Sequence, residues 1–273
     1  MLNDATDAQS TGIYKTVIDT ILQLLPADTI YLAGTRHEAC RSNSIFNAGA
    51  KQESERLSFL YLVIIANLED KAAHEWQDRL EAHCKKIISC TTIVLDTTAF
   101  LQWLKEAHPF SCRVVQQANC LHRSAGYSVH EEALPIGVPS SSESLLAGGL
   151  NMYKEFMAAA ELFSLRKQNR LACFMLHQAM ELGLHSILKA GAGFHYRTHN
   201  IERLMTYASL VHEELFYWTH GTEKHRKLLH KLQQAYSGAR YDECYGVNAC
   251  ELNEITQLVK RLEGFFEGGK GCW

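Results

Sequence analysis

The first half of the chain is organised around one apolar run, Ser58-Phe59-Leu60-Tyr61-Leu62-Val63-Ile64, which continues without a charged residue to Ala66. Successive side chains of a strand point to opposite faces of a sheet, so Phe59 and Tyr61 would project from the same face. A strand that is apolar on both faces is typical of one that is covered on both sides. We therefore predict a buried central strand at Phe59–Ala66.

Helical and strand-like segments alternate on both sides of this strand. The expected helices are Ile13–Leu25, Lys71–Lys86 and Thr97–Ala107, and the other expected strands are Thr29–Ala33, ending at Gly34, and Ile87–Leu95. Thr97 or Thr98 is the expected cap of the third helix, and Cys112–His122 fits either a helix or a strand. This order predicts an α+β domain with a small mixed sheet and flanking helices.

The second half is expected to be all helical. All four prolines, at positions 26, 109, 135 and 139, precede residue 140, and proline disrupts helix interiors. The expected helices span 145–168, 170–190, 201–210, 224–241 and 252–266. Their short connections predict a helical bundle. We therefore divide the chain into an α+β domain at 1–125, a Gly-, Pro- and Ser-rich linker at 126–144 and a bundle at 145–273.

Composition narrows the function classes. The chain has 273 residues and a net charge of −3, which argues against a protein that coats nucleic acid but leaves room for a local basic site. Nine scattered cysteines without a Cys-x-x-Cys pair indicate reduced thiols and a cytoplasmic protein. No zinc-ligand set and no membrane-spanning run are recognised, so we expect no metal, no cofactor and no membrane association.

Two segments of the first half carry a resemblance. Ile30-Tyr31-Leu32-Ala33-Gly34-Thr35-Arg36 and Ser58-Phe59-Leu60-Tyr61-Leu62 resemble the Gly-Ser turn and the Ser-Asp-x-Asp-Leu strand of the minimal nucleotidyltransferases. In that family the turn approaches a triphosphate and the two aspartates hold magnesium ions. Phe59 and Tyr61 replace both aspartates. Asp96 would match the third carboxylate, which alone does not hold two dications, so the resemblance implies a degenerate domain without nucleotidyl transfer.

Two interpretations of the aromatic pair stay open. In one, Phe59 and Tyr61 fill the former cleft. In the other, Gly34, Thr35 and Arg36 keep a remnant phosphate pocket, and Tyr61 stacks on a nucleotide base.

The second half resembles the HEPN domains (higher eukaryotes and prokaryotes nucleotide-binding). The resemblance covers about residues 145 to 268 and rests on four segments in order: Gln178-Ala179-Met180-Glu181, Gly191 to Gly193, Thr198-His199-Asn200 and Ala239-Arg240-Tyr241. Nucleotidyltransferase and HEPN domains often occur together, so the two likenesses support each other. The resemblance also implies a homodimer through the bundle.

The predicted helix 170–190 carries a polar stripe. His177, Glu181 and His185 follow each other at intervals of four residues, with Arg170 on nearly the same face. The stripe is either a solvated or buried hydrogen-bonded set, or one wall of a cleft or dimer seam. Glu181 is expected to raise the pKa values of the two histidines towards neutrality.

Many HEPN domains are metal-independent ribonucleases with an Arg-x(4–6)-His motif. Arg170 and His177 match its spacing on the wrong helix, which we treat as a chance match. At the expected position the chain has Arg240-Tyr241-Asp242-Glu243-Cys244-Tyr245, with Tyr245 in place of the histidine. A phenol with a pKa near 10 is a poor base at neutral pH.

The expected HEPN cleft therefore consists of Arg240, Tyr241 and Tyr245, with His177 and Glu181 nearby, and it has no catalytic residue. We predict a regulatory protein that binds a nucleotide or RNA without cleaving it, as a toxin–antitoxin-like or stress-related component. One alternative is a HEPN ribonuclease with an altered acid/base group, and another is a pure dimerisation scaffold. The basic segment 223–231 is expected to be a solvated helix face, with RNA contact as its alternative.

Overall fold

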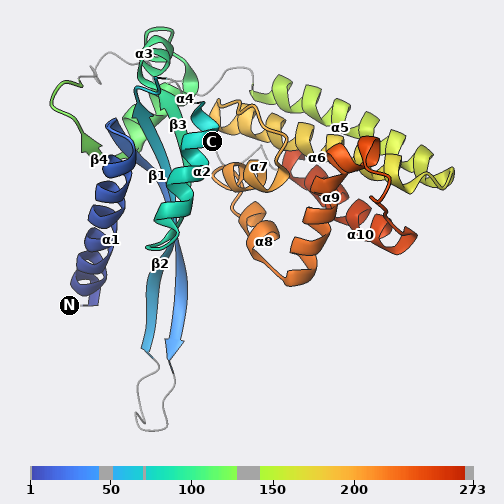
Figure 1. Cartoon of the computed structure of the whole chain (residues 1–273), viewed down its shortest axis with the longest axis horizontal. Coiled ribbons are helices and arrows are strands. Elements are labelled where there is room, and N and C mark those ends of the chain that lie inside the picture. Colours follow the sequence, from blue (N-terminus) through green and yellow to red (C-terminus); the bar gives the residue numbers. More distant parts are fainter. Residues whose placement is uncertain (1, 43–51, 70–71, 128–141, 268–273) are drawn as a thin grey trace. The chain divides into compact units, whose positions relative to one another are not determined.

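The computed structural model describes residues 2–42, 52–69, 72–127 and 142–267 (Figure 1). The chain divides into two compact units, Met1–Ile136 and Gly137–Trp273. The division falls inside the predicted linker 126–144, most of which lies outside the described residues. The linker and domain boundaries at 125 and 145 stay predictions.

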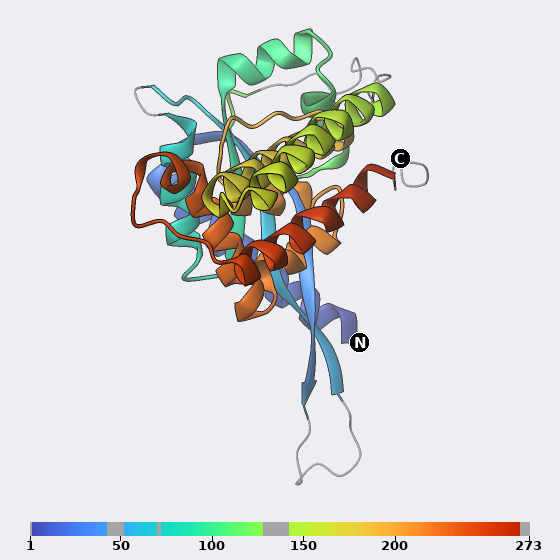
Figure 2. The same cartoon turned by 90° about the vertical axis from the view of Figure 1, so that its right-hand side faces the viewer.

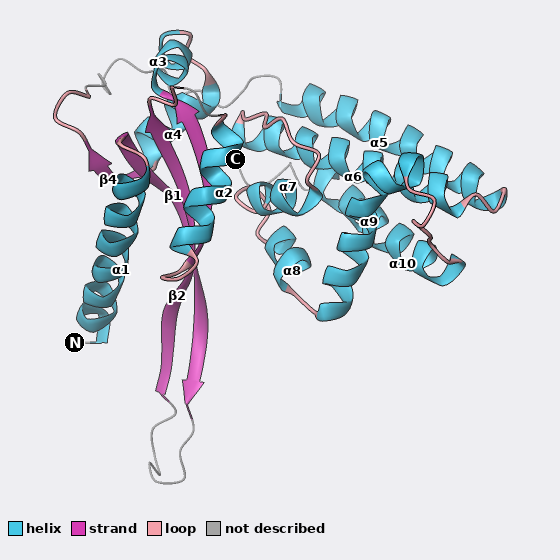
Figure 3. Cartoon of the chain, in the orientation of Figure 1, coloured by secondary structure: helices cyan, strands magenta, loops and turns pink. Residues whose placement is uncertain are grey.

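The first unit has the predicted α+β fold, which is a small mixed sheet with helices (Figure 3). Its elements are α1 (Leu2–Leu24), β1 (Ala27–Ser42), β2 (Gln52–Ala66), α2 (Ala73–Cys84), β3 (Ser89–Asp96), α3 (Thr97–Lys105), α4 (Pro109–Gln117) and β4 (Asn119–Arg123). The sheet order is β3-β2-β1-β4, with β2 parallel to β3 and the other two pairs antiparallel. The ambiguous segment 112–122 contains the end of α4 and most of β4.

The central strand β2 is buried on both faces, as predicted. Leu60, Leu62 and Ile64 belong to a hydrophobic cluster that also contains Ile21 of α1 and Leu80 of α2. Phe59 and Tyr61, which alternate with these residues, are buried on the opposite face. Burial on both sides explains why the strand contains no charged side chain between Phe59 and Ala66.

Strand β1 runs well past its predicted end. Its pairing with β2 continues through Gly34 as far as Ser42, with a register shift between Leu32 and Gly34. β4 pairs only with Thr29–Leu32 and β3 only with Phe59–Ala66, so the distal parts of β1 and β2 form a two-stranded ribbon (Figure 2). The prediction of a turn at Gly34 was wrong, because Gly34 pairs with Tyr61 inside a continuous strand, and it is Ala33, at the register shift just before it, that lacks a partner in this pairing.

The second unit is all helical, as predicted. Its elements are α5 (Ser142–Leu165), α6 (Asn169–Ala192), α7 (Ile201–Ala208), α8 (Glu214–His220), α9 (Glu223–Tyr241), α10 (Ala249–Lys260), the 3₁₀ turn η2 (Arg261–Glu263) and α11 (Gly264–Glu267). α8 was not predicted. α6 is the central helix and packs against α5, α7, α9 and α10. It ends at Gly193, whose φ of 68° is left-handed and suits glycine.

Local signals set several helix ends. Asn200 caps α7, because its side chain accepts a hydrogen bond from the Arg203 amide at 2.9 Å. Asn248 and Glu251 form a capping box that starts α10 three residues before the predicted position. The cap of α3 is Asp96 rather than Thr97 or Thr98, since Asp96 Oδ1 accepts from the amides of Thr98 and Ala99.

Among the described residues, only α6 is long and apolar enough to cross a membrane. Most of its length is buried inside the helical unit, which is typical of the core helix of a bundle.

Candidate nucleic-acid interface

Helices α6 and α9 meet along a polar seam. His177 and Glu181 lie one turn apart on α6, and Tyr236 and Arg240 lie one turn apart on α9. The rings of His177 and Tyr236 pack with their centroids 5.2 Å apart. His177 is fully buried and Glu181 nearly so, so the polar stripe is mainly a buried set rather than a solvated face.

The loop between α6 and α7 adds His199 to this seam. His199 Nδ1 lies 2.9 Å from Glu181 Oε1, and its ring stacks on Tyr236 with centroids 4.4 Å apart and planes inclined by 18°. Gln233 of α9 fixes the loop, because it accepts from the Ile201 amide at 2.7 Å and donates to the His199 carbonyl at 3.1 Å. The His199 side chain is 58% exposed, so one side of the imidazole remains open to a ligand.

Arg240 extends the same face towards solvent. Its Nε and Nη2 atoms donate to the Tyr236 carbonyl at 2.9 and 2.6 Å. Its guanidinium carbon lies 4.9 Å from the ring centroid of Tyr236, 5.0 Å from that of Tyr241 and 5.1 Å from that of Phe174. Tyr241 is 79% exposed. A cation held among aromatic rings is suited to contact both the phosphate and the bases of a single strand.

The buried histidines are neutral at pH 7. Burial lowers the pKa of His177 to about 4, and the charges of His199 and Arg240 act in the same direction. Burial also lowers the pKa of His185 to about 4, helped by the charge of His195, on whose ring it stacks. The expectation that Glu181 raises these pKa values was wrong. Glu181 Oε1 contacts His199, and its other oxygen is 3.6 Å from His177, which is too far to offset desolvation.

Tyr245, which the sequence placed in the same cleft, lies elsewhere. Its hydroxyl donates to the Lys231 carbonyl at 3.1 Å and contacts Cys173 Sγ at 3.2 Å, and its ring packs against Gly238. Burial raises the pKa of Tyr245 far above its ordinary value. Together with Tyr241 it lines a separate hollow of about 380 Å³ at the end of α9. The five predicted cleft residues thus fall in two places, joined by the Arg240–Tyr241 contact.

Arg170 also has a structural role. Its guanidinium donates to the carbonyls of Gly238 at 3.1 Å and Asp242 at 2.5 Å. The Gly238 carbonyl also accepts from the backbone amide of Asp242, so Arg170 adds a second donor to the last turn of α9. Arg170 thus holds the end of α9, whereas His177 packs on Tyr236. Because the two residues have separate structural roles, their match to the ribonuclease spacing does not indicate a shared catalytic site.

In the first unit, Gly34, Thr35 and Arg36 form no turn that a phosphate would approach. Gly34 pairs with Tyr61 across the strands, and Arg36 Nε donates to the Tyr61 hydroxyl at 2.7 Å. The rings of Phe59 and Tyr61 pack 5.1 Å apart and both residues are buried. Of the two interpretations, this geometry favours a cleft filled by its own side chains. Asp96, the candidate third carboxylate, is occupied as the cap of α3.

The basic run at the start of α9 is largely neutralised. Lys224 pairs with Glu254 at 2.9 Å, Lys227 with Glu223 at 2.7 Å, and Lys231 lies 3.7 Å from Glu251. This favours a solvated helix face. In the part of the chain that the structure describes, no cluster of three His, Cys, Asp or Glu side chains is arranged to hold a metal ion.

His199 and Tyr236 are the two site residues that the sequence did not single out. Tyr236 was only one position of the predicted helix 224–241. The only signal for His199 was the segment Thr198-His199-Asn200 just before a helix, which gives no role to the imidazole. Its contact with Glu181 depends on the path of the loop, which the sequence pattern does not predict.

The helical unit matches a known family. The family model described as the HEPN domain matches residues 151–271. A comparison with curated proteins found no match.

Proposed function

We propose that the HEPN domain at residues 151–271 binds single-stranded RNA or a nucleotide without cleaving it, through a surface made by His199, Tyr236, Arg240 and Tyr241. We call these four residues the aromatic–cation face. The observation that carries the proposal is the exposed guanidinium of Arg240 held among the rings of Tyr236 and Tyr241, beside a stacked and exposed imidazole. A HEPN domain also implies a role in RNA binding or RNA cleavage.

The chemistry of this face suits a single strand. Unstacked bases stack on aromatic rings and on guanidinium planes, at about 1–3 kcal/mol per base. Arginine adds a planar donor set that matches phosphate oxygens. Because the nearby lysines of α9 are paired with carboxylates, we expect few phosphate contacts and a shallow dependence of affinity on salt.

A non-catalytic role agrees with both units. Tyr245 replaces the histidine of the ribonuclease motif and its hydroxyl is buried, so it has no route to a substrate proton. The first unit is proposed to be a degenerate nucleotidyltransferase whose cleft is filled by Phe59 and Tyr61. We further propose a cytoplasmic homodimer that acts as a toxin–antitoxin-like or stress-related regulator.

Substituting Arg240 with alanine should weaken binding of a short single-stranded RNA by about tenfold or more, since it removes both a phosphate donor and a stacking surface. Fluorescence anisotropy in EDTA measures this dissociation constant. Arg226→Ala, on an exposed position of the same helix, is the matched control and should have little effect. A larger loss with Arg226→Ala would assign binding to the basic run instead. If the wild type binds neither RNA nor any nucleotide, the binding proposal fails and the dimerisation scaffold is the alternative that remains.

One observation favours a second candidate, a metal-independent ribonuclease. Glu181 holds Nδ1 of His199, so Nε2 is the nitrogen available for proton transfer, and Arg240 lies against the same tyrosine ring. In such a reaction the imidazole accepts the proton of a 2′-hydroxyl, which attacks the adjacent phosphorus. The bond to the 5′-oxygen breaks, that oxygen takes up a proton, and a 2′,3′-cyclic phosphate remains.

If this second candidate is right, His199→Ala should abolish cleavage of labelled RNA in EDTA, while His195→Ala in the same loop keeps it. The cleavage products are separated on a denaturing gel. Intact RNA after incubation with the wild type, under conditions where anisotropy shows binding, eliminates the ribonuclease and supports the binding protein.

A further inference from the structure

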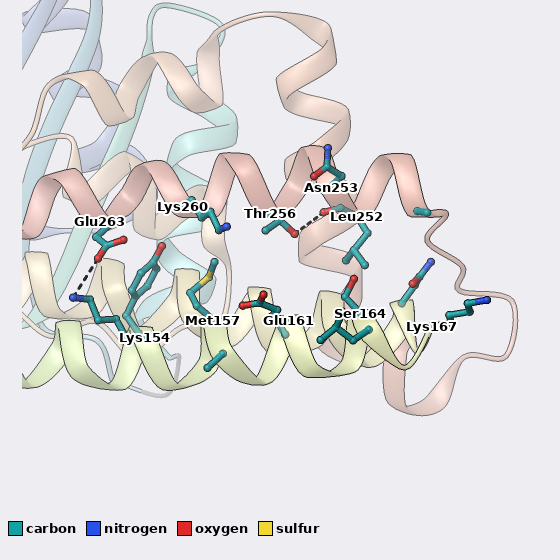
Figure 4. Close-up of a pocket in the computed structure, with 16 residues that line it drawn as sticks. Lys154, Met157, Glu161, Ser164, Lys167, Leu252, Asn253, Thr256, Lys260 and Glu263 are labelled. Atoms are coloured by element: carbon teal, nitrogen blue, oxygen red, sulfur yellow. Dashed lines mark hydrogen bonds and ion pairs between the residues drawn. The ribbon is translucent and has the colours of Figure 1, made fainter.

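Helix α5 has one largely exposed face in the described part of the helical unit. Tyr153 and Ala160 are buried against the bundle, whereas Leu162 is 55% and Leu165 77% exposed. Between α5 and α10 lies an open groove of about 950 Å³ (Figure 4). Lys154, Met157 and Glu161 project into it from α5, and Asn253, Thr256 and Lys260 line its other side. Leu165 lines this groove, so an exposed apolar side chain and an open groove lie together on one candidate contact surface.

Six residues of α5, spaced one to four positions apart, lie on the exposed side of the helix. They are Leu150, Lys154, Met157, Ala158, Glu161 and Leu165. Their spacing places them on a single helical face, which we call the α5 seam. Within the described residues none of the six is fully buried, and the only ion pair they make is that of Lys154 with Glu263, at 3.3 Å.

The α5 seam is complementary to itself when reversed. Leu150 and Leu165 lie equally far from the midpoint between Met157 and Ala158, and so do Lys154 and Glu161. In an antiparallel pair related by a two-fold axis at that midpoint, each Lys154 faces Glu161 of the second copy. The leucines meet at both ends, and the small Ala158 allows close approach at the centre. Isologous interfaces require this kind of self-complementarity.

We infer that two copies of the chain associate through the α5 seam, with the α5 helices antiparallel and each covering the other's α5–α10 groove. This inference names the surface of the homodimer proposed above and rests on that proposal. In this register each basic side chain faces an acidic one, whereas in other registers like charges would meet. Such charge pairs determine how two helices are oriented, as they do beside the core of a coiled coil. The interface lies on α5 and leaves the aromatic–cation face of α6 and α9 outside it.

A charge-reversal experiment tests the register. Lys154→Glu and Glu161→Lys each place two like-charged pairs in the dimer, and each should raise its dissociation constant about tenfold or more. An equimolar mixture of the two variants should recover the wild-type mass, because every pair across the mixed interface is again of opposite charge. The double variant K154E/E161K should also dimerise. Analytical ultracentrifugation over a dilution series measures all four samples.

Glu155→Lys is the matched control, since Glu155 is an exposed residue of α5 outside the seam, and it should dimerise like the wild type. Single variants that dimerise normally, or a mixture that stays monomeric, would overturn the α5 interface while leaving the homodimer intact. A monomeric wild type would overturn both. RNA anisotropy on the same samples reports the binding proposal separately, because Arg240→Ala should weaken RNA binding without changing the mass.

Discussion

Replacing Gly149 with alanine should destabilise the helical unit by about 2 kcal/mol, because the added methyl group has no room where α5 crosses α6. A Cβ atom at Gly149 would overlap the Cβ and Oγ atoms of Ser186. The Ser186 hydroxyl is itself bonded to the Leu182 carbonyl at 2.8 Å, and rotating it would not move Ser186 Cβ away. The helices would have to separate, which loses contacts along the most extensive helix–helix interface of the unit.

The neighbouring glycine supplies the matched control. Gly148 lies in the same helix and a Cβ there would meet nothing within 4 Å. Gly148→Ala should therefore stabilise the protein by about 0.5–1 kcal/mol, through the lower entropy of the unfolded chain. Urea unfolding followed by circular dichroism measures both changes. If the two variants shift in the same direction, the glycines act only through helix propensity and the close crossing is not a determinant of stability.

The periodic features of this chain were accessible from its sequence. The all-apolar run Phe59–Ala66 predicts a doubly buried strand, and α6 is mainly apolar because bundle neighbours surround it. The Asn200 cap of α7 is a signal of the same local kind, because its side chain acts within the same turn. These signals are local, and tertiary contacts agree with them.

The misplaced features depend on partners that are distant in sequence. Gly34 looks like the end of a strand, but pairing with β2 carries β1 through it, with the register shift at Ala33. Tyr245 follows Arg240 at the spacing of a catalytic motif, yet its hydroxyl reaches Lys231 on an earlier turn of α9. Asp96 resembles a metal ligand, but at the start of a helix a carboxylate also satisfies free backbone amides.

The candidate site could be predicted in part, because some of its residues belong to a local motif or to one helical face. Arg240 and Tyr241 were identified from the motif itself, and the polar stripe of His177 and Glu181 from helical spacing. The electrostatics of the stripe were predicted with the wrong sign, since burial of His177 exceeds the influence of a carboxylate 3.6 Å away. The spacing of residues in a sequence predicts which charged groups share one helical face. The desolvation of a side chain depends instead on all the helices that pack around it.

His177 should make the protein lose stability as the solution is acidified from pH 6.5 to about pH 4. The unfolded imidazole takes up a proton near its ordinary pKa of 6.5, but in the folded state burial lowers the pKa of His177 to about 4. Over that interval the unfolded state binds more protons, so the free energy of unfolding falls with falling pH. The difference in pKa corresponds to about 3 kcal/mol at pH 4 and below. His185, whose pKa burial also lowers to about 4, should add a similar loss over the same range.

A variant separates this contribution from the general acid sensitivity of the carboxylates. His177→Leu keeps an apolar side chain in contact with Tyr236 and has no proton to bind, so its free energy of unfolding should fall less steeply between pH 6.5 and 4. Urea titrations of both proteins at intervals of half a pH unit give the difference directly. The stability of the wild type relative to the variant should fall by about 3 kcal/mol between pH 6.5 and 4. Parallel profiles would mean that His177 ionises as readily in the fold as in the unfolded chain. The neutrality of buried His177 would then fail, and the ribonuclease candidate could no longer restrict proton transfer to His199.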